Sequence, residues 1–157
     1  MQRALTTAIA LTLLSGVRPL TSGDTTFAAR AADGDSVIFA VGDIADCDNM
    51  DPSRATARLI EGVAGTILTL GDHAYPKGTL KQFRECYGQT WGRYRSRTRP
   101  AIGNHDIIAD DGHSYFDYFG ERAGPRGLGY YSFDLGAWHV ISLNSNNRFS
   151  ASTGRME

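Results

Sequence analysis

The chain contains three short, mainly apolar segments, each followed at once by glycine and a polar residue. They are residues 36–41 before Gly42-Asp43, residues 66–70 before Gly71-Asp72, and residues 99–102 before Gly103-Asn104. Apolar runs of this length are typical of parallel strands buried on both faces. The polar positions are separated by 29 and 32 residues, and each interval can hold one crossover helix. The sequence therefore predicts an α/β fold.

Parallel strands bring their carboxyl ends to one edge of a sheet, so we expect Asp43, Asp72 and Asn104 to converge there. Carboxylate and amide oxygens suit hard divalent or trivalent metal ions. Tyr75 is close enough to Asp72 to bind the same ion as a phenolate, provided that a cation lowers its pKa. Asp72, on the middle strand, is the natural bridge between two ions. Two such ions activate a water for phosphoryl displacement.

His105 and Asp106 complete the polar stretch after the third strand. We expect His105 to donate a proton and Asp106 to orient it or to supply charge. The alternative interpretation is a polar turn without chemistry. Asp46 and Asp48, after the first strand, are interpreted as solvated loop residues.

Two helices are predicted between the strands. The first begins at Asp51-Pro52, with Asp51 as N-cap, and its buried face consists of Ala55, Leu59, Ile60 and Val63. The second begins with a capping box of Thr79 and Gln82, and its buried face consists of Leu80, Phe83 and Tyr87.

Beyond the third strand, residues 115–119 are interpreted as an aromatic packing segment. Residues 130–134 and 138–143 predict an antiparallel hairpin. His139 within it is expected to be packed and hydrogen-bonded, and His113 to lie in a loop. Residues 144–147 form a loop placed like the earlier strand ends.

Two other features leave alternatives open. Cys47 and Cys86 can form a disulfide in an oxidising compartment or remain as two buried thiols, and their spacing matches no zinc motif. Alternating arginines at 93, 95, 97 and 99 form either a solvated extended edge, the favoured interpretation, or a phosphate-binding row.

Residues 1–31 are typical of an export signal. Arg3 precedes a stretch of 14 uncharged residues, and Ala29-Arg30-Ala31 offers a cleavage site before Ala32. The apolar run is too short for a stable membrane span. The mature chain, residues 32–157, would hold 13 basic and 16 acidic side chains, because 1–31 contains Arg3, Arg18, Arg30 and Asp24. No basic excess indicates nucleic-acid binding, and we expect a secreted or periplasmic protein.

Asp43, Gly71-Asp72-x-x-Tyr75 and Gly103-Asn104-His105-Asp106 together resemble the first three motifs of the calcineurin-like metallophosphoesterases. The resemblance is best to the purple acid phosphatase-like branch, because Ala45 replaces a histidine of other branches and Tyr75 is present. It implies a four-layer α-β-β-α sandwich and hydrolysis of phosphate mono- or diesters. It also implies that Asp43, Asp72 and Tyr75 bind iron, while Asp72 and Asn104 bind zinc, iron or manganese. His105 would then lie over the substrate phosphate.

The family also has a further lone histidine and a Gly-His-x-His motif downstream, and Gly112-His113-Ser114-Tyr115 imitates the latter only in part. We therefore expect roughly the amino-terminal half of the domain, truncated at its carboxyl end and inactive alone. The alternative function is a non-catalytic secreted domain with a partial cation site. A Rossmann-type nucleotide binder is disfavoured, because no Gly-x-Gly-x-x-Gly follows the first strand.

Overall fold

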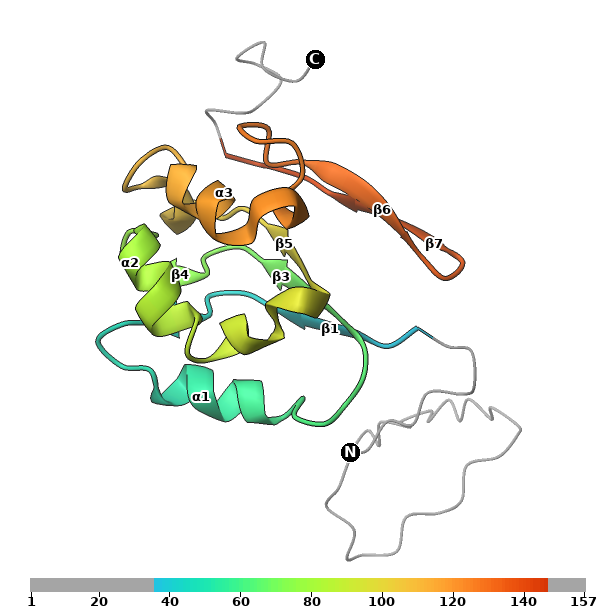
Figure 1. The fold of residues 1–157 in the computed structure, drawn as a ribbon, viewed down its shortest axis with the longest axis horizontal. Helices are drawn as coiled ribbons and strands as arrows, with labels where there is room; N and C mark the ends of the chain where they lie inside the picture. Colours follow the sequence, from blue (N-terminus) through green and yellow to red (C-terminus); the bar gives the residue numbers. More distant parts are fainter. Residues whose placement is uncertain (1–35, 147–157) are drawn as a thin grey trace, which may run out of the picture. The chain divides into compact units, whose positions relative to one another are not determined.

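The computed structural model describes residues 36–146, so the expected export signal lies outside the described residues. Figure 1 shows the arrangement of the helices and strands. In chain order they are β1 (Ile38–Val41), β2 (Ala45–Asp46), α1 (Asp51–Arg58), β3 (Thr66–Leu70), β4 (Ala74–Tyr75), α2 (Leu80–Gln82), η1 (Phe83–Tyr87), η2 (Trp91–Arg97), β5 (Thr98–Ala101), η3 (His105–Ile107), α3 (His113–Phe119), η4 (Gly120–Ala123), β6 (Tyr131–Leu135) and β7 (Trp138–Ser142).

The three predicted strands form one parallel sheet in the order β1-β3-β5. Val41 pairs with Thr69, and Leu70 pairs with Ala101, so the three strands end side by side. The short strands β2 and β4 form a second parallel pair just beyond them. The predicted α/β class and the central position of β3 are confirmed.

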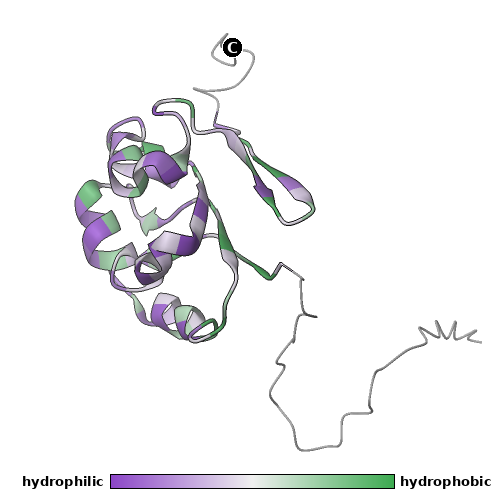
Figure 2. Ribbon diagram, turned by 45° about the vertical axis from the view of Figure 1, so that its right-hand side comes forward, coloured by the Kyte–Doolittle hydropathy of each residue, from purple (hydrophilic) through white to green (hydrophobic). Residues whose placement is uncertain are grey.

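The predicted hairpin is also confirmed, since β6 and β7 pair in antiparallel register from Tyr131–Ser142 to Leu135–Trp138. It lies beside the β5 edge, where the Tyr131 hydroxyl donates to the carbonyl of Pro100 at 2.9 Å. Figure 2 shows the helical segments together on one side of the parallel strands and the hairpin on the other.

Only one face of the parallel sheet is buried among the described residues, so the expectation of burial on both faces is wrong here. On the covered face, Ile67 and Thr98 are fully buried. On the opposite face, Ile38 is 41% exposed and Leu70 is 64% exposed. An apolar run does not distinguish a strand covered on two faces from one covered on a single face.

Helix α1 packs with a face that agrees only in part with the one predicted: Ile60, just after the helix, is buried as expected, but Ala55 is exposed. Its N-cap is Met50 instead of Asp51, and its buried residues are Ser53 and Ala57. Leu59 lies beyond the last turn and is 78% exposed. The Ser53 hydroxyl donates to Thr90 at 2.8 Å, so a polar anchor sets the rotation of the helix.

The second helical segment agrees with prediction at its start and in its buried face. Thr79 and Gln82 form the capping box, and Phe83 and Tyr87 are fully buried. The α-helix is short, however, because the backbone continues as the π-helical turn η1. Cys86 in this turn forms a disulfide with Cys47, with 5.3 Å between the Cα atoms. The disulfide alternative is thereby confirmed over free thiols.

Residues 91–97, which were expected to be extended, form the 3-10 helix η2. The arginines of this stretch therefore point in different directions. The guanidinium of Arg97 donates to the carbonyls of Ile60, Val63 and Gly65, which ties η2 to the segment after α1.

The core behind the sheet is aromatic. The ring of His73 lies at its centre, with ring centroids of neighbouring aromatic residues 4.8 to 5.9 Å away. These neighbours are Phe83, Tyr87, Tyr115 and Phe119. The packing role predicted for residues 115–119 is confirmed. Within residues 36–146, none of the helices has both the length and the apolar character needed to cross a membrane.

Candidate functional site

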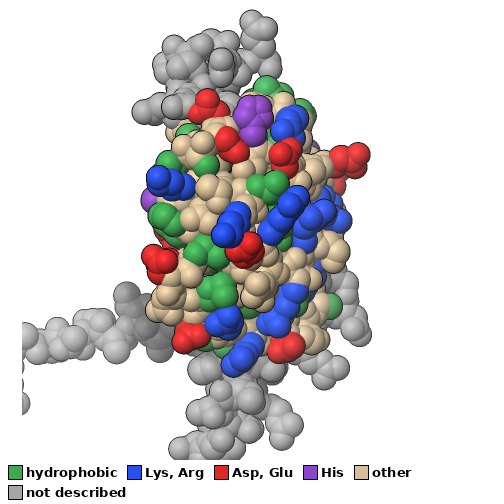
Figure 3. Space-filling view, turned by 60° about the vertical axis from the view of Figure 1, so that its left-hand side comes forward, with side chains coloured by type: hydrophobic (Ala, Val, Ile, Leu, Met, Phe, Trp, Pro, Cys, Tyr) green, Lys and Arg blue, Asp and Glu red, His purple; other side chains and the backbone are tan. Residues whose placement is uncertain are grey.

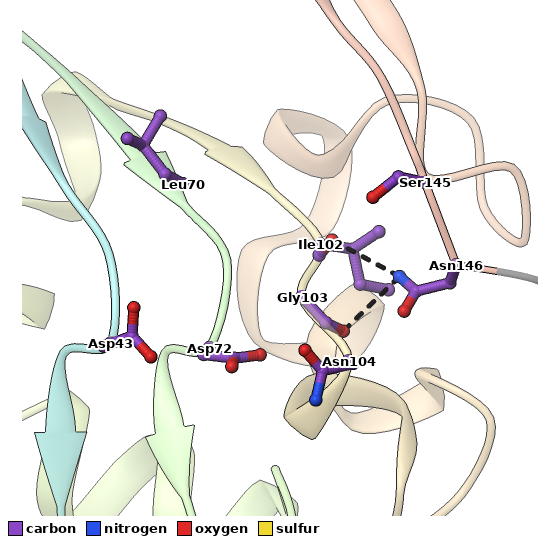
Figure 4. Close-up of a pocket in the computed structure, with 8 residues that line it drawn as sticks. All are labelled: Asp43, Leu70, Asp72, Ile102, Gly103, Asn104, Ser145 and Asn146. Carbon is purple, nitrogen blue, oxygen red and sulfur yellow. Dashed lines mark hydrogen bonds between the residues drawn. The ribbon is translucent and has the colours of Figure 1, made fainter.

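Asp43, Asp72 and Asn104 follow β1, β3 and β5 and line one pocket at the carboxyl edge of the sheet (Figure 4). The pocket has a volume of about 540 Å³. Its other lining residues are Leu70, Ile102, Gly103, Ser145 and Asn146. The predicted convergence of the three strand-end residues is present in the structure.

Asp43 and Asp72 share an uncommon backbone conformation. Their φ angles are 53° and 54°, in the left-handed region that side chains with a Cβ seldom adopt. Each such residue costs on the order of 1 kcal/mol or more, and aspartate tolerates it better than most. The same turn at two neighbouring strand ends directs both carboxylates towards the same edge.

Two glycines allow the second and third strand ends to approach each other. A Cβ on Gly103 would lie 2.1 Å from Oδ1 of Asp72 and 2.2 Å from its backbone nitrogen. A Cβ on Gly71 would lie 2.7 Å from the Cα of Gly103. The contact between Asp72 and the Gly103 backbone therefore requires glycine.

The phenol oxygen of Tyr75 lies between the two carboxylates. It is 2.5 Å from Oδ1 of Asp43 and 3.0 Å from Oδ2 of Asp72. The Tyr75 hydroxyl has one proton, so it can donate to only one of the two carboxylates at a time. The phenol oxygen and the two carboxylate oxygens therefore share a single proton. Burial raises the pKa of Tyr75, and its hydrogen bonds to Asp43 and Asp72 raise it further. Without a cation, this phenol keeps its proton.

The other oxygen of Asp72 is fixed by the third strand end, because Oδ1 accepts a hydrogen bond from the backbone N–H of His105 at 2.9 Å. The His105 ring lies 4.4 Å from the Tyr75 ring between centroids. Its Nδ1 is 2.8 Å from the carbonyl oxygen of Pro76. A carbonyl can only accept, so Nδ1 is the donor and Nε2 remains for other chemistry.

Asp106 does not pair with the His105 ring, and the expected orienting contact is therefore wrong. Its carboxylate is fully buried and lies 2.8 Å from Nδ1 of His73. It also accepts backbone N–H groups of Asp72, His73 and Gly103 at 2.8 to 3.0 Å. Asp106 therefore links the ends of β3 and β5 from the buried core and does not face the pocket.

The burial of Asp106 raises the pKa of its carboxyl group. The paired His73 and the backbone donors of Gly103 and His73 outweigh that effect, so the pKa lies below its ordinary value. The carboxylate therefore remains ionised inside the core.

Sequence reasoning missed His73, whose other ring nitrogen is 2.7 Å from the Thr69 hydroxyl. Its signal was weak, since a histidine after Gly-Asp resembles any loop residue. Ser145 and Asn146 were also missed as pocket residues. The placement of residues 144–147 like the earlier strand ends was the available signal. Asn146 Nδ2 donates to Oδ1 of Asn144 at 2.9 Å.

The remaining histidines lie outside the pocket. His113 is exposed, as expected of a loop-like position, although it begins α3. His139 was expected to be packed and hydrogen-bonded: the hydrogen bond is present, since Nδ1 lies 2.7 Å from Oδ1 of Asp134 across the hairpin, but the side chain is exposed. The alternation of apolar and polar residues predicted the hairpin but not its register, and so it did not reveal this cross-strand pair.

Within residues 36–146, no three His, Cys, Asp or Glu side chains gather as a metal-binding group. The strand-end site consists instead of two carboxylates, one phenol and one amide. Fold and site together define a mixed α/β protein with an oxygen-rich pocket at the carboxyl edge of a parallel sheet. No protein-family model, curated protein or solved structure gives a significant match to this chain.

Proposed function

We propose that this chain carries part of the dinuclear metal site of an exported phosphoesterase, an enzyme that hydrolyses phosphate mono- or diesters with a metal-activated water. One observation carries the proposal: the oxygens of Asp43, Asp72 and Tyr75 meet with one hydroxyl proton among them. A cation satisfies such an oxygen cluster better than a proton does. The motif resemblance to the purple acid phosphatase-like branch supports the same function.

The oxygen donors fit hard or borderline metal ions. Asp43, Asp72 and Tyr75 would hold one ion, expected to be iron. Asp72 and Asn104 would hold a second, expected to be zinc, iron or manganese. When bound, these ions would supply a water of lowered pKa and positive charge opposite the phosphoryl oxygens.

The protein groups orient this chemistry. The backbone N–H of His105 holds Asp72 through Oδ1, which leaves Oδ2 directed towards Tyr75. The contact with Pro76 holds Nδ1 of His105 as the donor. In the imidazolium form, Nε2 of His105 would carry a second proton and give it to the departing alkoxide.

The proposal includes the four-layer sandwich that the family resemblance implies. Ile38 and Leu70 on the open face of the sheet support it, because a second layer would cover them.

A second candidate function is cation binding without catalysis. The small ligand set of the second ion favours it, because only Asp72 and Asn104 are assigned there. Catalytic zinc sites usually have about three protein ligands. Ser145 and Asn146 line the same pocket and are further oxygen donors, although neither offers a charge.

The deciding experiment begins with metal-free protein. Thermal unfolding is followed while Mn²⁺, Zn²⁺ or Fe³⁺ is added, and hydrolysis of a phosphomonoester is measured in the same samples. A bound ion at about 100 times its dissociation constant stabilises the folded state by about 2.7 kcal/mol. We expect stabilisation of the wild-type chain, little in Asp72→Asn, and an unchanged response in Asp48→Asn, which alters an exposed loop carboxylate. Equal responses of both variants would contradict the site.

A further inference from the structure

Three arginines line a second cavity, which has a volume of about 500 Å³. Arg95 comes from η2, Arg99 from β5 and Arg122 from η4. Phe119, Gly120 and Glu121 complete the lining. Figure 3 shows one face of the molecule, on which several Lys and Arg side chains lie at the surface with Asp and Glu side chains among them.

These three guanidinium groups have no acceptor among residues 36–146, in contrast to Arg97 and Arg126. Arg97 donates to backbone carbonyls, and Arg126 pairs with Asp117 at 2.8 Å. Among residues 36–146, no carboxylate or carbonyl accepts a hydrogen bond from Arg95, Arg99 or Arg122. Their N–H donors are therefore free to bind a ligand.

Two of the guanidinium groups are held in place by aromatic rings. Arg95 lies over the ring of Tyr118 at 5.4 Å, and Arg99 lies over the ring of Phe133 at 4.9 Å. Stacking uses the flat face of the guanidinium and leaves its N–H edge available. Because these two side chains are already ordered, the entropic cost of binding a ligand is lower.

The charge of the lining favours an anion. Three positive side chains face one negative side chain, Glu121, which makes no ion pair with a residue of the described range. Arginine binds phosphate oxygens through paired N–H donors. The volume of about 500 Å³ exceeds that of one phosphate group, so the cavity has room for a chain of phosphates.

The cavity is distinct from the strand-end pocket. Arg99 precedes Ile102, a lining residue of that pocket, by three residues, which corresponds to about 10 Å along a strand. A single phosphate cannot contact both sites.

We infer that the cavity bounded by Arg95, Arg99 and Arg122 is a binding site for an oligophosphate, the chemistry shared by inorganic triphosphate and a nucleoside triphosphate. The sequence had offered a phosphate-binding arginine row as the less favoured interpretation. The structure divides that row: Arg95 and Arg99 belong to the site, whereas Arg97 is committed to backbone carbonyls.

Calorimetric titration of the metal-free 157-residue chain with sodium triphosphate tests this inference. Inorganic phosphate, sulfate and a nucleoside triphosphate are titrated in parallel. We expect triphosphate to bind more tightly than phosphate or sulfate. If the nucleoside triphosphate binds as tightly as triphosphate, the cavity recognises the phosphates alone. If it binds more tightly, the cavity also contacts the base. Either result supports the site.

The variants Arg99→Gln and Arg122→Gln each remove charge-assisted hydrogen bonds, so each should weaken triphosphate binding about tenfold or more. Arg84→Gln is the matched control, because Arg84 is exposed and lies outside the cavity. Asp72→Asn, which removes the proposed metal bridge, should leave triphosphate affinity unchanged, so the two proposals fail separately. No binding, or equal weakening in Arg84→Gln and Arg99→Gln, would overturn the inference.

Discussion

Nδ1 of His73 lies 2.8 Å from Oδ2 of Asp106, and neither side chain is exposed to solvent. The same carboxylate accepts backbone N–H groups from Asp72 and Gly103. The ends of β3 and β5 are therefore held together by a buried charged group. The geometry of the candidate metal site depends on this contact beneath it.

Substitution Asp106→Asn should destabilise the chain by about 3 kcal/mol or more, because breaking a buried pair leaves His73 without its partner. An amide would also place N–H donors against the backbone donors. The free energy of unfolding by urea measures the effect. Asp48→Asn, at an exposed position, should change it little. Equal stabilities of the two variants would show that the buried pair is dispensable.

The stabilisation by Asp106 should depend on pH. Its folded-state pKa lies below the ordinary value of 3.8, so its contribution is fully present above that value. It is lost as the pH falls through the lower folded-state pKa. We expect the stability difference between wild type and Asp106→Asn to be constant near neutrality and to shrink below about pH 4. A difference unchanged on acidification would contradict the ionised state assigned here.

Gly103→Ala should disrupt the strand-end site, because its Cβ would lie 2.1 Å from Oδ1 of Asp72. We expect a loss of stability of about 2 kcal/mol or more and loss of metal-induced stabilisation. Gly42→Ala is the matched control, since its Cβ would meet Leu70 Cβ at 3.4 Å and Gly42 has no positive φ. Thermal unfolding with and without Mn²⁺ compares them. If both variants respond like wild type, the close approach of the strand ends has no role.

The disulfide between Cys47 and Cys86 closes a loop with a sequence separation of 39 residues. In the chain-entropy account, a loop of this size contributes about 3 to 4 kcal/mol. The double variant Cys47→Ala/Cys86→Ala should lose stability of that order in urea unfolding. The wild-type protein should titrate no free thiol under denaturing, non-reducing conditions. Two reactive thiols there would contradict the bridge.

The strand-end convergence was predictable because its signal is repeated. Asp43 and Asp72 each follow a strand and a glycine, and parallel pairing then places them together whatever the helices do. The capping box at Thr79 was equally local, since it needs only one turn of chain.

The features that were missed depend on packing that local patterns do not encode. The rotation of α1 is set by the Ser53–Thr90 hydrogen bond, which joins residues 37 positions apart. Asp106 looked like a partner for the adjacent His105, but the core places His73 within its reach. Sequence proximity was a poor guide to which histidine meets which carboxylate.

Hydrolytic activity of residues 32–157, the mature chain that the proposed export signal predicts, is expected to be negligible even with added metal. The assigned ligands of the second ion are only Asp72 and Asn104, and neither His113 nor His139 lies in the pocket. Steady-state hydrolysis of a phosphomonoester by residues 32–157 measures this. Robust turnover that disappears in Asp72→Asn would contradict this prediction and show that Asp72 and Asn104 are not the only ligands of the second ion.

The central claim is that Asp43, Asp72 and Tyr75 hold a metal ion, and the visible spectrum after Fe³⁺ is added to metal-free protein tests it most directly. A phenolate bound to ferric iron gives a charge-transfer band, and binding displaces the phenol proton that the metal-free site retains. We predict this band in the wild type. We also predict it in the control variant Tyr94→Phe, because the Tyr94 hydroxyl donates to the carbonyl of Ala57 and takes no part in the site. We predict that Tyr75→Phe lacks it. A band of equal strength in Tyr75→Phe, or none in the wild type, would contradict the account.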